Sequence, residues 1–113
     1  MKLPKSYKDF IASVGSKSFK DVNDMEGSTT KVVPPKQLDF SGYRAGALKD
    51  TDEDSAAVDG VMFAATDHGD CFVFDISGDG AEYPVFYYNH ELNAMEPWSG
   101  NFAECVKRFA ERN

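Results

Sequence analysis

Three short apolar runs in the middle of the chain alternate with turns rich in glycine and aspartate. The runs cover residues 61–66, 71–76 and 83–88, and the turns cover residues 67–70 and 77–82. Runs of five or six β-branched and aromatic residues bounded by such turns are typical of β-hairpins. The pattern therefore predicts an antiparallel meander in the centre of the chain.

The middle run is apolar on both of its faces. One face carries Phe72, Phe74 and Ile76, and the opposite face carries Cys71, Val73 and Asp75. Side chains alternate between the faces of a strand, so this run predicts a central strand covered at least partly on both sides. The third run contains Pro84 near its start, which favours the first position of a strand or a sheet edge.

Helical spacing of apolar residues appears at both ends of the chain. The first pattern predicts a helix over residues 4–14 with Pro4 in the first turn and Gly15 after its end, and its apolar face holds Leu3, Tyr7, Phe10, Ile11 and Val14. The second pattern predicts a helix whose apolar face holds Phe102, Cys105, Val106 and Phe109. Its N-cap is either Asn101, which forms a capping box with Glu104, or Ser99.

The remaining segments have weaker patterns. We expect an irregular segment at 16–30, a short strand at 31–33 that ends at the prolines, and a helical turn within 35–40. We expect a surface excursion at 41–59 and a connector at 89–97. Strands in one block with helices at the two ends predict an α+β fold, an antiparallel sheet flanked by an N-terminal and a C-terminal helix, in a single domain at 1–113.

Charge is divided sharply along the chain, whose formal net charge is −7. Residues 1–49 hold nine Lys or Arg and five Asp or Glu, whereas residues 50–106 hold thirteen Asp or Glu and no Lys or Arg. Such an anionic half repels nucleic acid and anionic lipid and attracts basic proteins or cations. The charge pattern therefore argues against nucleic-acid or membrane partners.

The chain has the features expected of a cytoplasmic protein. No apolar run approaches the about 20 residues that span a bilayer, and the start of the sequence has no apolar signal-peptide region. Two cysteines, Cys71 and Cys105, without an export signal predict free thiols in a reducing compartment.

Several side chains could in principle carry chemistry. Metal ligation is possible if two turns meet in space, with Asp67, His68, Asp70, His90 and Glu91 as the candidates, although residues 67–70 also have ordinary turn chemistry. The segment from Asp75 to Gly80 resembles the start of an EF-hand loop but has Phe86 where glutamate is required. Cys71 with His68 could form a nucleophile and base, but a cysteine in an apolar strand usually acts as a small hydrophobic residue. We therefore expect no enzyme activity, metal or cofactor.

Four short segments resemble the SUKH superfamily, which includes fungal Smi/Knr-type cell-wall regulators and bacterial toxin-immunity proteins. They are LPKSYKDFI at 3–11, FAATDHGDCFVFD at 63–75, PVFYYNHE at 84–91 and the closing helix around Phe102. They occur in the family's order across most of the chain. His68 stands where the family usually has glycine, and residues 16–59 match poorly.

The resemblance implies a non-catalytic protein-binding domain of the same α+β fold. The first hypothesis is an immunity protein that binds and neutralises a toxin domain, for which a basic nuclease-type toxin suits the acidic half. The expected contact residues combine acids with an aromatic residue of a type common in interfaces, namely Asp52, Glu53, Asp54, Asp67, Asp70, Asp79, Glu82 and Trp98. The alternatives are a Smi/Knr-type regulatory adaptor and a small metal-dependent enzyme that uses His68 and His90.

Overall fold

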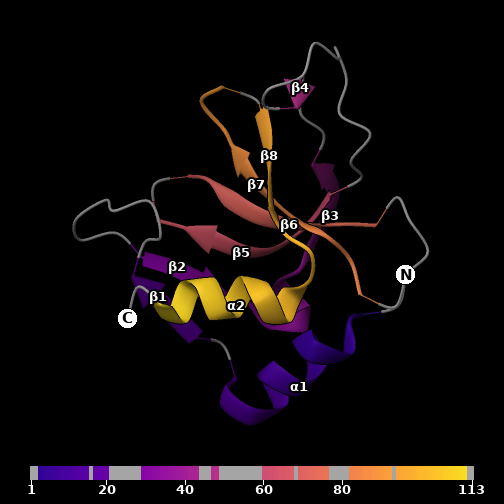
Figure 1. Cartoon of the computed structure of the whole chain (residues 1–113), viewed down its shortest axis with the longest axis vertical. Coiled ribbons are helices and arrows are strands. Elements are labelled where there is room, and N and C mark those ends of the chain that lie inside the picture. Colours follow the sequence, from indigo (N-terminus) through magenta and orange to yellow (C-terminus); the bar gives the residue numbers. More distant parts are fainter. Residues whose placement is uncertain are drawn as a thin grey trace.

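A computed structural model describes residues 3–15, 17–20, 29–43, 47–48, 60–67, 69–76, 82–92 and 94–111. Over these residues the chain forms one eight-stranded sheet and two helices (Figure 1). The strand order is β1-β2-β5-β6-β7-β8-β4, and β3 also pairs with β5. The α+β fold predicted from the sequence is therefore confirmed.

The centre of the sheet is the predicted meander with one further strand. It consists of β5 (Gly60–Thr66), β6 (Cys71–Asp75), β7 (Val85–Asn89) and β8 (Ala94–Ser99), each antiparallel to the next. The prediction of a connector at 89–97 is wrong from Ala94 onward, because β8 begins there. Pro97 obscured this strand in the sequence, since proline is uncommon within sheets. The described residues of β4 pair with Ala94 and Met95 of β8, not with Pro97.

One edge of β5 is covered by two strands in succession. β2 (Thr29–Val32) pairs with the C-terminal half of β5, and β3 (Asp39–Tyr43) pairs with its N-terminal half. Between them Val33 N donates to Phe63 O at 2.9 Å, and a 3-10 turn, η1 (Pro35–Gln37), follows. The two adjacent prolines thus interrupt a strand that resumes along the same neighbour.

Two sequence-based predictions about the edges need correction. The irregular segment expected at 16–30 contains β1 (Lys17–Lys20), which pairs with β2. The surface excursion expected at 41–59 contains the end of β3 and the two-residue β4 (Ala47–Leu48). The other residues of that excursion, 44–46 and 49–59, lie outside the described part of the chain.

Both predicted helices are present, although Pro4, which was expected in the first turn, lies just before it. α1 (Lys5–Val14) has Pro4 as its N-cap, and the N–H of Gly15, at φ 68°, donates to Ile11 O. α2 (Phe102–Glu111) begins after Asn101, whose Oδ1 accepts from Glu104 N at 2.9 Å. Glu104 Oε2 in turn accepts from Gly100 N at 3.1 Å. The first bond satisfies a first-turn N–H group and identifies Asn101 as the N-cap, whereas the second returns to the residue before the cap.

The main core lies between the two helices and one face of the sheet. Phe72 contacts Phe109 of α2 with ring centroids 4.9 Å apart, and Phe74 contacts Tyr7 of α1 at 5.8 Å. The Tyr7 hydroxyl donates to Val33 O at 2.6 Å, so this buried polar group is satisfied.

On the other face of the sheet, Cys71 and Val73 of β6 form a smaller buried cluster with Met95 of β8. Burial on both faces confirms the prediction for the middle run. In the described part of the chain, no helix is long and apolar enough to cross a membrane.

Candidate functional site

The turn between β5 and β6 is closed by reciprocal bonds between its first and last residues. Thr66 N donates to Asp70 O at 2.9 Å, and Asp70 N donates to Thr66 Oγ1 at 3.0 Å. The Thr66 hydroxyl also donates to Asp70 O at 3.0 Å. These contacts fix the position of Asp70 at the start of β6.

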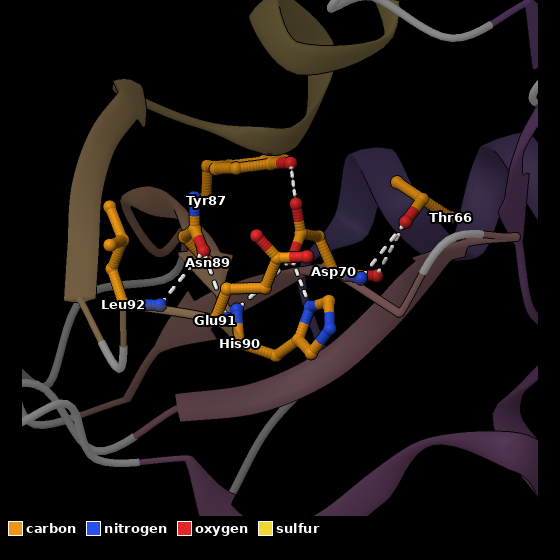
Figure 2. Close-up of polar contacts among 7 residues, drawn as sticks. All are labelled: Thr66, Asp70, Tyr87, Asn89, His90, Glu91 and Leu92. Carbon is orange, nitrogen blue, oxygen red and sulfur yellow. Dashed lines mark hydrogen bonds and ion pairs between the residues drawn. The ribbon is translucent and has the colours of Figure 1, made fainter. Parts of the chain in front are cut away.

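The carboxylate of Asp70 joins this turn to the hairpin between β7 and β8 (Figure 2). One oxygen accepts from the hydroxyl of Tyr87. The other accepts from His90 N at 3.0 Å and lies 2.5 Å from His90 Nδ1. Asp70 is only 6% exposed, so its carboxylate has lost most of its hydrating water. The hydrogen bonds from these partners compensate for that loss.

Gly69 allows the imidazole of His90 to lie against this turn. Its φ is 101°, a conformation that side-chain-bearing residues rarely adopt. A Cβ atom at this position would lie 2.8 Å from His90 Cε1, too close for normal contact. Both the backbone conformation and the approach of His90 therefore favour glycine at this position.

The tip of the β7–β8 hairpin is held by the side chain of Asn89. Its Oδ1 accepts from Glu91 N at 3.0 Å and from Leu92 N at 3.1 Å. This is the Asx-turn chemistry that asparagine commonly provides. Glu91 and Leu92 are exposed on this turn. The side chain of Leu92 points away from the ring of His90 (Figure 2).

The predicted contact residues occupy different environments. Asp67 is exposed at the β5–β6 turn, where its Oδ2 accepts from Thr29 N at 3.1 Å. Asp70 is close by in sequence but buried, so its described contacts are internal. Four of the predicted contact residues lie outside the described residues, namely Asp52, Glu53, Asp54 and Asp79.

Glu82 and Trp98 are tied to the two helices. Glu82 accepts from the hydroxyl of Ser6 in α1. The Arg108 guanidinium of α2 lies 3.7 Å from the centroid of the Trp98 ring and donates to Trp98 O. Trp98 also packs edge-on against Phe72 at 5.1 Å, so much of its ring serves intramolecular packing.

The described residues offer neither a reactive thiol nor a group of metal ligands. Burial raises the pKa of Cys71 to about 12, and burial also raises the pKa of Cys105. A thiol with a raised pKa is a poor nucleophile at neutral pH. In the part of the chain that the structure describes, no three His, Cys, Asp or Glu side chains are grouped to hold a metal ion. His68 and the EF-hand-like residues 77–80 lie outside that part.

The two turns considered as a metal site do meet, and among the described candidates it is Asp70 and His90 that join them. The structure thereby brings together two of the family-like segments, 63–75 and 84–91.

A SUKH-family model described as SMI1-KNR4 cell-wall matches residues 1–105. The chain belongs to the SUKH family. No curated protein and no solved structure matches this SUKH chain significantly.

Two features of this SUKH site have no clear indication in the sequence. The hydroxyl of Tyr87 bonds to Asp70, a contact between residues that are distant in the chain. Leu92 is an isolated leucine with no periodic pattern around it. The Asx-turn potential of Asn89 was the available indication that 89–92 forms an ordered tip.

Proposed function

We propose that this SUKH domain is a non-catalytic immunity protein that acts in the cytoplasm by binding and neutralising a basic toxin domain. The observation that carries the proposal is the junction of the β5–β6 turn and the β7–β8 tip through Asp70 and His90. It produces an ordered end of the sheet within a segment, 50–106, that contains no Lys or Arg. Preorganised surfaces bind at a lower entropic cost than surfaces that must be ordered.

The charge of this segment supports a basic protein partner. A uniformly acidic surface accelerates encounter with a basic protein and disfavours wrong partners, and both effects weaken as salt rises. Asp67 and Glu91 are exposed at the junction and are positioned to take part. Asp70 has a supporting role in this proposal because its carboxylate is engaged inside the domain.

The experiment is co-expression of the tagged chain with the products of its genomic neighbours, followed by capture at moderate salt. A stoichiometric basic partner that is released as salt rises and that loses its toxicity in the complex would support the proposal. Reversing the charge of Asp52, Glu53, Asp54 and Asp79 together should abolish capture. The control reverses Asp9 and Glu111, two exposed acids outside the 50–106 segment, and should leave capture intact.

A regulatory adaptor is the second candidate, and the description of the matched family model as SMI1-KNR4 cell-wall favours it. An adaptor would bind a cellular signalling protein instead of a toxin. A non-toxic regulatory partner, recovered without any toxin gene nearby, would support the adaptor and contradict the immunity function.

A further inference from the structure

Leu92 stands out among the apolar side chains of the described residues. Only two large apolar side chains are exposed in that part of the chain, Val14 at 50% and Leu92 at 74%. Hairpin turns usually consist of Gly, Asn, Asp and Ser, so the turn itself does not require leucine at this position. A leucine exposed to this extent gains nothing from the fold of its own domain.

The backbone that carries Leu92 is held by two sets of hydrogen bonds. Asn89 Oδ1 binds the N–H groups of Glu91 and Leu92, and Asp70 binds both the N–H and the imidazole of His90. The exposed leucine is therefore presented by an ordered turn. An apolar side chain on a preorganised turn can insert into a partner with little loss of backbone entropy.

Among the described residues, two exposed acids accompany Leu92 at this end of the sheet. Glu91 precedes it and is exposed, and Asp67 is exposed on the adjoining turn, whose Gly69 lies against His90. A two-fold dimer through this tip would bring identical acidic groups together, and a nucleic acid would be repelled by the same charge. A partner surface complementary to an exposed leucine flanked by acidic side chains is an apolar pocket with lysine or arginine at its rim.

We propose that the tip of residues 89–92 is the part of the domain that enters its partner, with Leu92 seated in an apolar pocket edged by lysine or arginine. This inference rests on the proposed function, because it names the contact through which that partner would be held. Buried apolar anchors commonly dominate binding energy, whereas charges at the rim mainly govern the association rate.

The first test compares full-length variants in binding to the neighbouring-gene product that co-purifies with the wild-type chain. Leu92→Ala should raise Kd at least about tenfold, mainly through faster dissociation. Glu91→Gln should slow association and reduce its salt dependence. The matched control, Val14→Ala, removes the other exposed apolar side chain and should leave Kd within about twofold of wild type. An unchanged Kd for Leu92→Ala would overturn this inference but would leave the proposed immunity function standing.

The second test uses the burial of both native cysteines. A Leu92→Cys variant can be labelled selectively with a maleimide photocrosslinker, and Val14→Cys provides the matched control. Cross-links from position 92 should map to an apolar pocket flanked by basic residues, with few from position 14. Cross-links between two copies, or none from position 92 in the intact complex, would overturn the inference. A wild-type chain that captures no neighbouring product would refute both this inference and the immunity function.

Discussion

Nδ1 of His90 lies 2.5 Å from Oδ1 of Asp70, although the two residues are separated by 20 positions in the chain. The same carboxylate oxygen accepts from the backbone N–H of His90, and the other oxygen accepts from Tyr87. One buried acid thus determines how two turns sit relative to each other. Its removal should affect both the stability of the domain and the geometry of the proposed contact surface.

Replacement of Asp70 tests this relationship directly. Asp70→Ala leaves the hydroxyl of Tyr87 and the N–H of His90 without their acceptor, which should lower the free energy of unfolding by about 2–3 kcal/mol. Asp70→Asn keeps one carbonyl acceptor and should cost less. Urea denaturation measures both values, and Tyr87→Phe in each background shows how much of the loss belongs to the hydroxyl. A loss below about 0.5 kcal/mol for Asp70→Ala would contradict the proposed role.

Gly69→Ala should destabilise the domain by about 1–3 kcal/mol, because it combines a strained φ with a clash against the His90 ring. Gly15 provides a matched control, since its φ is also positive but a Cβ there would meet nothing within 4 Å. In a His90→Ala background the loss caused by Gly69→Ala should shrink, whereas that caused by Gly15→Ala should not. If Gly69→Ala lowers the free energy of unfolding equally with and without the His90 ring, the ring contact is unimportant.

The buried thiol of Cys71 predicts a specific loss of stability at high pH. Its pKa is raised from 9.0 to about 12, so between these values the native thiol keeps a proton that the unfolded thiol has lost. Unfolding then releases a proton, and stability falls as pH rises, by up to about 1.4 kcal/mol per pH unit. Below pH 9 this contribution is fully present.

The measurement is the free energy of unfolding in urea at several pH values above 8. Cys71→Ala is less stable at neutral pH because it leaves a cavity, but its stability should fall less steeply between pH 9 and 12. Native protein should also react slowly with dithionitrobenzoate at neutral pH. If stability falls equally steeply with pH in the wild type and in Cys71→Ala, or if native Cys71 is labelled rapidly, the thiol is not buried as the structure shows.

Arg108→Ala should expose the face of Trp98 that the guanidinium covers. The loss of this cation–π contact should cost about 0.5–1 kcal/mol and shift the emission of the single tryptophan to longer wavelength. Lys107 is a neighbouring exposed cation on the same helix. The control variant Lys107→Ala should change neither the stability nor the emission wavelength. If Trp98 contacts a partner as the sequence predicts, Arg108→Ala should also alter partner affinity.

Periodic patterns in the sequence were sufficient to predict the helices and strands that bury a continuous face. Tyr7 and Phe109 recur at helical spacing with their neighbours, and Phe72 and Phe74 alternate with Cys71 and Val73. Burial of these residues is the dominant favourable contribution to folding, so the pattern is strong where the element is central. Caps such as Asn101 could also be predicted, because their bonds are local in sequence.

The strands at the sheet edges, and one strand next to an edge, could not be predicted in the same way. The edge strands β1 and β4 are four and two residues long, and β8, which lies beside β4, contains Pro97. Edge strands bury only part of one face and tolerate polar residues and proline, so their sequences carry little alternation. Their pairing follows from neighbouring strands that are already in place.

By itself, the sequence determined the α+β class, the two helices, the central meander, the acidic half and the family. It also supplied both turns of the candidate site as separate motifs. Only the tertiary structure decided that Asp70 binds His90, since the β6–β7 register, which pairs Cys71 with Tyr88, is what brings those turns together. Registers depend on long-range strand pairing and packing. A buried carboxylate that joins two turns therefore becomes apparent only once the strands are paired.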